Sequence, residues 1–234
     1  MPVAVITGAS QGLGLSLATD LAASGWSVVA DARRADLLGQ AVDGLPGGPH
    51  RAVPGDVTDA AHRAALVAAA ADLGGAALLV NNASTLGASP LPRLADLSPA
   101  TYERILAVDV VAPVALAAAL LPQLRAHGGR IVNITSDASV EAYEAWGGYG
   151  SAKAALDQAS RVMAAEEPGV RVYAVDPGDL RTTMHQAAFP GEDISDRPEP
   201  ETVVPALLRL VTERPPSGRY RAAELLAGAA AVTA

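Results

Sequence analysis

The chain has 234 residues, of which 50% are apolar and 18% charged, and its formal net charge is −8. This composition predicts a folded protein with a sizeable core, and the negative charge argues against a nucleic-acid-binding protein, which would present a basic face. The absence of cysteine excludes disulfides, thiolate metal sites and a cysteine nucleophile.

Short apolar, β-branched runs alternate along the chain with longer Ala- and Leu-rich segments. Strands are predicted at residues 3–7, 27–30, 51–54, 77–80, 130–135 and 170–175, and helices at 12–23, 60–73, 102–124, 149–166 and 202–212, with a weaker one near 35–42. Because these strands are apolar on both faces, helices must cover both sides of the sheet. The sequence therefore predicts the α/β class: a Rossmann-like doubly wound parallel sheet in a single domain, residues 1–234.

Two segments interrupt this alternation. Residues 184–200 contain Gly191, four acids and three prolines without a clear period, so we expect a loop there and a substrate or lid segment at about residues 183–200. The longest apolar run, residues 105–121, contains Asp109 and Pro113 and is expected to be too short and too interrupted to span a membrane.

No basic leader segment precedes the first glycines, so a cytoplasmic protein is expected.

A glycine cluster, Thr-Gly-Ala-Ser-Gln-Gly-Leu-Gly at residues 7–14, joins the first strand to the first helix. Glycines let a backbone turn sharply and approach a pyrophosphate at a helix N-terminus. The spacing is not Gly-x-Gly-x-x-Gly, and no Gly-Lys-Ser/Thr follows, so a P-loop NTPase is not expected. The residues expected to contact a dinucleotide here are Gly8, Ser10, Gln11, Gly12, Leu13 and Gly14.

Polar residues close the third and fourth strands. Asp56, next to Val57, can accept a hydrogen bond from an adenine amino group, although a helix N-cap is an equal alternative. Asn82 and Ala83 follow the fourth strand, at the sheet edge where ligands bind in open α/β folds, with turn chemistry as the alternative.

Ser136 follows the fifth strand, and Tyr149 and Lys153 come later, in Tyr-Gly-Ser-Ala-Lys. On a helix, residues i and i+4 share a face, so the phenol and the ammonium are expected to meet. A nearby cation favours the phenolate, and we expect Lys153 to lower the pKa of Tyr149 from about 10 toward the range of an acid/base catalyst. A surface Tyr–Lys pair is the alternative, but Lys153 is the only lysine beside 16 arginines, which favours a specific role.

With these motifs, the sequence resembles the classical short-chain dehydrogenases/reductases up to about residue 182. The resemblance implies that Tyr149 protonates a carbonyl oxygen as hydride arrives from a nicotinamide, that Ser136 holds this oxygen, and that Lys153 also binds the nicotinamide ribose. It further implies a homodimer or homotetramer. Apart from the resemblance, the negative charge, the interrupted apolar run and the lack of metal-ligand clusters predict no nucleic-acid, membrane or metal partner. Three residues are expected to lie against the nicotinamide: Pro177, Gly178 and Thr182.

The sequence departs from the family pattern at three places. Asp109 stands where the family usually has an Asn whose backbone carbonyl holds a water in a relay to the lysine. The Asp can serve if the backbone carries the role; alternatively its carboxylate partly neutralises Lys153 or joins a proton relay. Ser84 replaces a family glycine. The usual C-terminal Val-Asp-Gly-Gly is missing, which leaves open the last strand and an oligomer contact by the Ala-rich tail.

The cofactor prediction depends on the end of the second strand. Asp31 suggests a carboxylate that binds a ribose and therefore indicates NAD. The family's acidic position, however, is one residue later and is occupied here by Ala32. A shift of one residue turns a strand side chain to the other face. Because Arg33 and Arg34 follow, we predict NADP(H), with Arg33 as the main contact of the 2′-phosphate and Arg34 and Ser10 as lesser ones; solvated loop arginines are the alternative.

The substrate prediction is a carbonyl compound or secondary alcohol of modest size. Tyr143 and Trp146 lie between Ser136 and Tyr149 in the sequence, and they are expected to line an apolar pocket with two residues of the lid segment, Met184 and Phe189. Core packing is the alternative for Trp146. His185 can touch a substrate, but a lone loop histidine is more often solvated.

Two other functions remain open. A redox-neutral enzyme on the same scaffold (a dehydratase, epimerase or cyclase) is left open by Asp109. A catalytically silent NADP(H)-binding sensor is disfavoured because Ser136, Tyr149 and Lys153 are all intact.

Overall fold

In the computed structural model, which describes residues 1–228, side chains of the central strands alternate between two apolar layers. In β1 (Val3–Ile6), Ala4 and Ile6 join one buried cluster while Val3 and Val5 join the other. Both faces of the strand are therefore buried, as its continuous apolar sequence requires. The remaining strands are β2 (Ser27–Ala32), β3 (Arg51–Pro54), β4 (Ala76–Asn81), β5 (Arg130–Ile134), β6 (Arg171–Asp176) and β7 (Gly218–Arg221).

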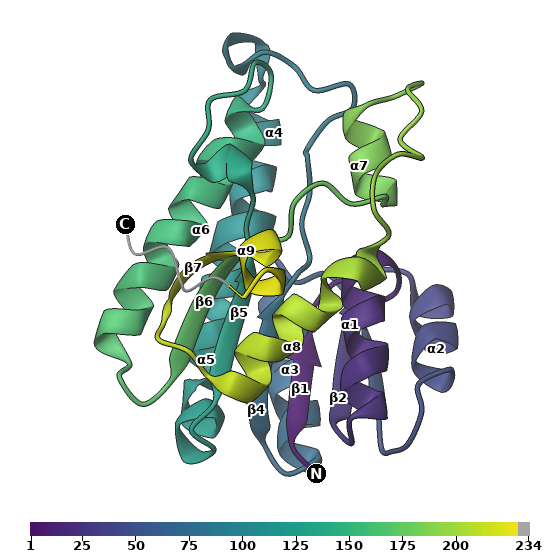
Figure 1. The fold of residues 1–234 in the computed structure, drawn as a ribbon, viewed down its shortest axis with the longest axis vertical. Helices are drawn as coiled ribbons and strands as arrows, with labels where there is room; N and C mark the ends of the chain where they lie inside the picture. The colour runs from purple at the N-terminus through teal and green to yellow at the C-terminus, as the bar shows by residue number, and fades with distance from the viewer. Residues whose placement is uncertain (229–234) are drawn as a thin grey trace.

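These strands form one seven-stranded sheet in the order β3-β2-β1-β4-β5-β6-β7, with every neighbouring pair parallel (Figure 1). The chain runs outward from β1 in one direction and then restarts at β4 in the other. The predicted doubly wound parallel sheet in a single domain is confirmed. Its helices are α1 (Gly12–Ala23), α2 (Ala35–Asp43), α3 (Ala60–Asp72), α4 (Pro99–Leu106), α5 (Ala112–Ala126), α6 (Gly147–Glu166), α7 (Thr183–Ala188), α8 (Val204–Glu213) and α9 (Ala222–Leu226).

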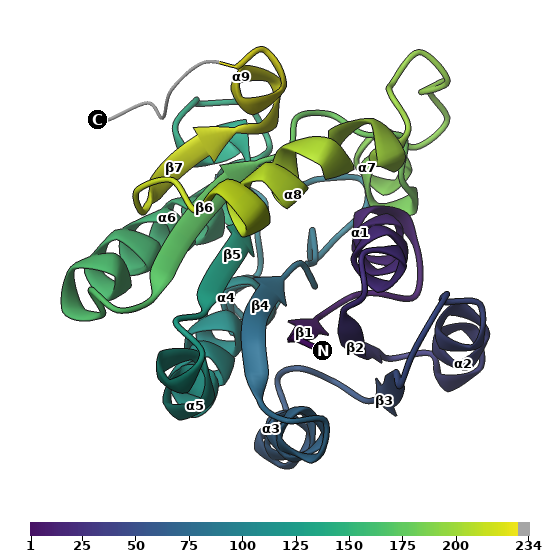
Figure 2. The same ribbon diagram turned by 60° about the horizontal axis from the view of Figure 1, so that its bottom comes forward.

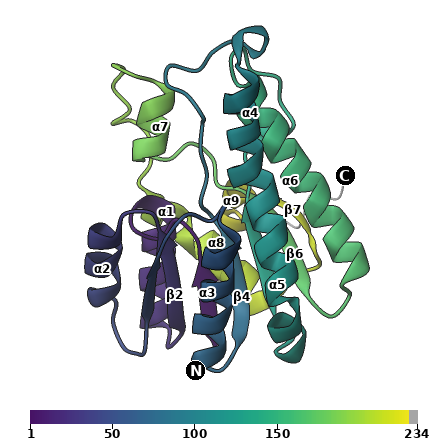
Figure 3. The ribbon, with the colours of Figure 1, turned by 180° about the vertical axis from the view of Figure 1, so that it is seen from behind.

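Helices cover both faces of the sheet, as expected. Leu17 of α1 and Leu207 of α8 pack with Ile6 on one face, where α1, α2 and α8 lie (Figure 1). Leu66 of α3 and Leu120 of α5 pack on the other face, which α3, α5 and α6 cover (Figure 3). Figure 2 shows the sheet between these two layers. The carboxyl ends of the central strands stay free of both layers, and the candidate site lies there.

The predicted helix 102–124 is a longer helical run, Pro99–Ala126, that contains a π-helical turn at Ala107–Val111. It begins where the Ser98 side chain accepts a hydrogen bond from the backbone N–H of Thr101. With 28 residues, this helical run is longer than the apolar run 105–121, and by length and composition alone it could cross a membrane. In this fold, however, the run packs along β4, α3 and α6, and 44% of its most apolar window is buried.

One prediction is wrong near the C-terminus, and two elements there were not predicted. Part of the expected loop 184–200 forms α7, which begins where Thr182 caps the backbone N–H of His185. β7 and α9 were not predicted, and β7 pairs with β6 at the sheet edge. The Ala-rich tail, residues 229–234, lies outside the described residues, and with it that part of the predicted domain and the expected tail contact.

Candidate active site

A cleft of about 1030 Å³ opens at the carboxyl ends of the strands. It extends from the loop after β2 across the glycine cluster to the start of α6 and to α7, which stands above the strand ends opposite α4 (Figure 1). Of the predicted site residues, only Gly14 and Asp109 are absent from its lining. Both lie directly behind lining residues and contact them, as described below.

The glycine cluster turns the chain into α1 with conformations that favour glycine. Gly8 and Gly12 have φ angles of +67° and +57°. A Cβ atom at Gly14 would lie 2.5 Å from the Gly8 carbonyl oxygen, so no other residue fits there. The backbone is thereby brought close to the cleft at the N-terminus of α1, an arrangement suited to an anion.

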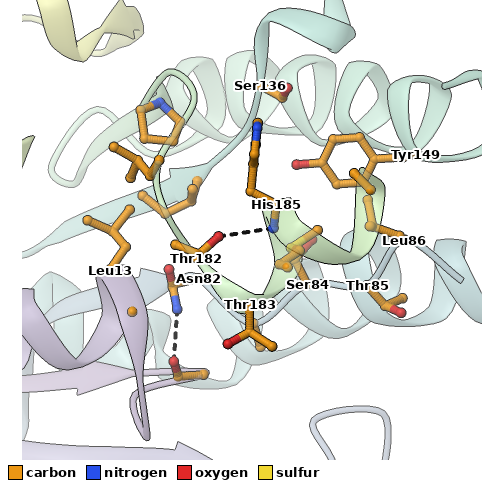
Figure 4. A pocket seen from close by; sticks show the side chains of 18 of the residues that line it. Leu13, Asn82, Ser84, Thr85, Leu86, Ser136, Tyr149, Thr182, Thr183 and His185 are labelled. Carbon is orange, nitrogen blue, oxygen red and sulfur yellow. Dashed lines mark hydrogen bonds between the residues drawn. The ribbon is translucent and has the colours of Figure 1, made fainter. Parts of the chain in front are cut away.

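Asn82 holds this loop from the neighbouring strand end (Figure 4). Its Nδ2 donates to the backbone oxygens of Thr7, at 2.9 Å, and Gly8, at 3.1 Å. The Thr7 hydroxyl oxygen in turn accepts from the backbone N–H groups of Asn82 and Ala83, each at 3.0 Å. The side chain of Asn82, predicted as a cofactor contact, is therefore engaged in fixing the glycine loop.

At the β2 end of the cleft, the Asp31 carboxylate is 1% exposed and lies 2.6 Å from Nε2 of His62. Burial raises the pKa of Asp31 to about 6, against the lowering effect of His62. Arg33 and Arg34 are exposed and line the cleft, and neither forms an ion pair with any residue in the described part of the chain. This end therefore offers two free cations and a carboxylate that is already bound.

The Asp56 carboxylate also has hydrogen-bond partners within the protein. Its carboxylate accepts from the backbone N–H and hydroxyl of Thr58, at 2.9 and 2.7 Å, and from Nη2 of Arg104, at 2.8 Å. Burial would raise the pKa of Asp56, but the hydrogen bonds from Arg104 and Thr58 hold it well below its usual range. Arg104 also lines the cleft, and nothing in the sequence analysis singled it out.

The predicted catalytic residues meet at the other end of the cleft. Lys153 is 2% exposed, and its Nζ lies 5.3 Å from the centroid of the Tyr149 ring. This Nζ donates to the Ile134 backbone oxygen at 3.0 Å. Ser136 lines the same end; its hydroxyl donates to Oδ1 of Asp137 at 3.0 Å and accepts from the backbone N–H of Ala138 at 3.2 Å.

Asp109 adds a negative charge to this group. Its fully buried carboxylate lies 3.2 Å from Nζ of Lys153 and accepts hydrogen bonds from the Ser84 hydroxyl and from the backbone N–H of Thr85. Asp109 is placed there by the π-helical turn. Of the alternatives stated above, the geometry matches a carboxylate paired directly with Lys153, with Ser84 between Asp109 and the cleft.

The net effect on Tyr149 is opposite to the prediction. Burial raises the pKa of the Tyr149 hydroxyl above its ordinary value; Lys153 lowers it as expected, but Asp109 raises it again, and the nearby hydroxyls of Ser136 and Ser84 lower it less. Burial would lower the pKa of Lys153, yet Asp109 and Tyr149 together raise it, so its ammonium stays charged. The cost of desolvating the phenolate depends on the burial of Tyr149, which is not visible in the sequence.

The remaining cofactor candidates lie on the loop after β6. Pro177, Gly178 and Thr182 all line the cleft, and Gly178 has a φ angle of +75°. The Thr182 hydroxyl accepts from the backbone N–H of His185 at 3.1 Å and still has its own proton to donate (Figure 4).

Aromatic side chains form the outer wall. The Trp146 ring lies 5.7 Å from that of Tyr149 and 6.0 Å from that of Phe189, between centroids. Tyr143 is 47% exposed and donates to Oδ2 of Asp137 at 2.9 Å. Met184 lines the cleft with them. The expectation that His185 is solvated is wrong, because its side chain is only 10% exposed.

An ion-pair network behind Ser136 was missed. Arg219 of β7 donates to Oδ2 of Asp157 at 3.1 Å and to the Ser136 backbone oxygen at 3.0 Å. Asp157 also accepts from the Ser139 hydroxyl, and Asp176 lies 3.6 Å from Nη2 of Arg219. The sequence signal for β7, which carries Arg219, was weak because two of its four residues are arginines.

The residues of the cleft fit a nicotinamide dinucleotide. The glycine cradle leaves no space for side chains at Gly8 and Gly14, where a Cβ would lie 2.9 and 2.5 Å from its nearest neighbours. A buried ammonium lies at one end, and at the other lie two guanidinium groups that form no ion pair with residues 1–228. These charges suit ribose hydroxyls and phosphates.

Several known proteins are similar to this chain. The family model described as short chain dehydrogenase matches residues 2–193. D-beta-hydroxybutyrate dehydrogenase of Cupriavidus necator is 31% identical over 229 residues, which cover 93% of this chain and 84% of the relative. Sepiapterin reductase of Bos taurus is 36% identical over 200 residues, covering 79% of this chain and 74% of the relative. The structure of an alcohol dehydrogenase from Thermococcus sibiricus, complexed with 5-hydroxy-NADP, superposes with a TM-score of 0.85 at 27% identity, covering 94% of this chain and 95% of that one.

Proposed function

Because the chain belongs to the short-chain dehydrogenase family and is a nicotinamide-dependent oxidoreductase, we propose that it uses NADP(H) to interconvert a small carbonyl compound and a secondary alcohol, with Tyr149 as the acid/base. The observation that carries this proposal is the position of Tyr149, Lys153 and Ser136 at one end of a cleft whose other parts fit a dinucleotide.

When bound, NADP(H) supplies or accepts the hydride. In the reduction, the Tyr149 hydroxyl gives its proton to the carbonyl oxygen, and the Ser136 hydroxyl donates a hydrogen bond to the same oxygen. Lys153 keeps its ammonium beside the Tyr149 ring and stabilises the phenolate that remains. Lys153 also lines the cleft, where its ammonium can bind ribose hydroxyls. α7 and the following residues, about 183–200, serve as a lid over the substrate end.

The acid/base role is tested by following NADPH absorbance with a panel of small ketones and aldehydes. Tyr149→Phe is expected to lower kcat by about 10²–10⁴-fold, because it removes the proton donor and leaves the ring in place. Tyr102→Phe is the matched control, since the Tyr102 hydroxyl binds only Ser151 on the surface of α4 and α6, at 2.9 Å. Equal turnover by Tyr149→Phe and the wild type would contradict the role.

The preference for NADP(H) is supported by Asp31, which is bound to His62, and by the unpaired Arg33 and Arg34. Comparing KM values for NADPH and NADH tests it. Arg33→Ala is expected to raise the KM for NADPH by about 10–100-fold, the loss of one charge-assisted hydrogen bond, with little effect on NADH. Arg51→Ala, an exposed arginine outside the cleft, serves as the control. An NADH preference that survives Arg33→Ala would overturn the proposal.

A redox-neutral enzyme is the second candidate, favoured by the Asp109 carboxylate 3.2 Å from Nζ of Lys153, which weakens the positive field on Tyr149. Tight NADPH binding without turnover of any carbonyl would favour this candidate or a sensor.

The proposal includes a homodimer or homotetramer. Val111 and Val162 are 59% and 44% exposed on the long helical run and on α6, where a second subunit would cover them. Sedimentation velocity on the wild type and on Val111→Asp tests this: a wild-type monomer would contradict it. The cytoplasmic location remains a prediction.

A further inference from the structure

One buried polar atom at the substrate end has no partner. The His185 side chain is nine-tenths buried, and its Nε2 has no hydrogen-bond partner among the described residues. Buried polar atoms are rarely left unpaired, because each one loses its hydration without compensation. Figure 4 shows the imidazole of His185 pointing toward the space between the hydroxyls of Ser136 and Tyr149. The unpaired atom therefore borders the place where the proposed reaction occurs.

The His185 ring is held in this position. It lies 5.0 Å from the Phe189 ring, between centroids, and its backbone N–H is fixed by the Thr182 hydroxyl. The other ring nitrogen, Nδ1, lies 3.9 Å from Oδ1 of Asp179. This distance is too long for a hydrogen bond, but the negative charge of the carboxylate on that side favours the tautomer with the proton on Nδ1. Nε2 is then an acceptor that needs a donor from the substrate.

The charges around this end narrow the class of substrate. Asp137 forms no ion pair with any residue between positions 1 and 228, and the cations nearest the lid are already paired: Arg197 with Asp179 and Asp196, and Arg181 with Glu199. A carboxylate on the substrate would meet the charge of Asp137, which no ion pair among residues 1–228 compensates. A neutral hydroxyl supplies the donor without this repulsion.

We infer that His185 is a specificity residue whose Nε2 accepts a hydrogen bond from a hydroxyl group adjacent to the reacting carbonyl. The preferred substrates are then neutral α-hydroxyketones, and the products are 1,2-diols. This inference rests on the proposed function. Under the proposed function, hydroxyacetone and NADPH give propane-1,2-diol and NADP⁺, with hydride added to the carbonyl carbon and the Tyr149 proton added to the carbonyl oxygen.

Hydroxyacetone and butanone form a matched pair, since a hydroxyl replaces a methyl of nearly the same size. Their ratio of kcat/KM is measured in the wild type, in His185→Phe and in His185→Gln, with pyruvate as the anionic comparison. Comparing ratios between variants cancels the intrinsic reactivity of the two ketones. We expect His185→Phe to reduce the preference for hydroxyacetone by about 10-fold or more, and His185→Gln, which retains an acceptor, to reduce it less. Pyruvate is expected to be the poorest substrate of the three.

Binding is measured separately from turnover by titrating each ketone into the protein with NADP⁺, which cannot reduce it, and following the fluorescence of Trp146. Trp26→Phe as the background leaves Trp146 as the only tryptophan. His127→Phe, a histidine at the end of α5, is the control and is expected to leave the ratio of affinities unchanged.

The outcomes separate the two proposals. If neither ketone is turned over, but hydroxyacetone binds more tightly and His185→Phe removes this difference, the proposed carbonyl reduction is contradicted and the role of His185 is supported. If His185→Phe lowers kcat/KM equally for both ketones, or if the wild type does not prefer hydroxyacetone over butanone, the role of His185 is overturned while the proposed reaction stands. A preference for pyruvate would also overturn it.

Discussion

At the scale of single residues, the catalytic end of the cleft contains one ammonium, that of Lys153, which interacts with two acidic groups, the Asp109 carboxylate and the Tyr149 phenol. Nζ of Lys153 lies 3.2 Å from Asp109 and 5.3 Å from the Tyr149 ring centroid. The carboxylate and the phenol therefore compete for the same positive charge. Because both Lys153 and Asp109 are almost inaccessible to solvent, this competition is weakly screened by salt.

Asp109→Asn should shift the pH dependence of reduction to lower pH. Tyr149 must carry its proton to act as the acid, so kcat/KM falls as the pH rises through the pKa of Tyr149. Asp109 raises that pKa, and removing its charge lowers it, so the fall should begin at a lower pH, by roughly one pH unit. The measurement is the pH profile of kcat/KM.

Asp72→Asn, at the end of α3 and away from the cleft, is the charge-matched control. A profile that Asp109→Asn leaves in place would show that the carboxylate does not act on Tyr149.

At the scale of elements, the short edge strand β7 supports the catalytic loop from behind. Arg219 connects it to the backbone of Ser136 and to α6 through Asp157. Oδ1 of Asp157 already lacks a hydrogen-bond partner within the part of the chain that the structure describes. Arg219 therefore provides most of the charge compensation for this buried carboxylate.

Arg219→Met should therefore lower the free energy of unfolding by about 3–5 kcal/mol, because it leaves a buried carboxylate unpaired. Urea unfolding measures this, and the residual folded enzyme should show a higher KM for the carbonyl substrate because Ser136 is less well held. Arg221→Met in the same strand is the control: Arg221 is largely exposed and contacts Asp176 only at 3.7 Å, so its loss should cost less than about 1 kcal/mol. Equal effects of the two variants would refute a special role for Arg219.

The elements that sequence reasoning missed share a physical cause. β7 reads Gly-Arg-Tyr-Arg, which lacks the apolar run of an interior strand, and its pairing with β6 alone makes it a strand. α7 has six residues, too few to display a helical period. Both form because of the surrounding structure rather than because of their own sequence pattern.

At the scale of the whole molecule, the fold and the lining of the cleft were predictable, because buried strands, glycine spacing and the Tyr–Lys interval are local patterns. What was not predictable depends on contacts across the fold. The meeting of Asp109 with Lys153 requires the π-helical turn, the sign of the Tyr149 shift requires its burial, and the unpaired nitrogen of His185 requires α7 to close over the cleft. Each of these is a tertiary effect.

The burial of the only lysine makes the chain a natural reporter of its own unfolding. A protease specific for lysine has one internal cleavage site, after residue 153, which lies inside the 20-residue helix α6, and the Lys153 side chain is enclosed by the protein. The folded chain should resist this protease, whereas the unfolded chain should be cut once into two fragments. Because cleavage requires opening of α6, the cut fraction in a short digestion should follow the urea unfolding curve measured by circular dichroism. NADP⁺ should protect the chain further, and efficient cutting without denaturant would show that α6 opens independently of the rest of the fold.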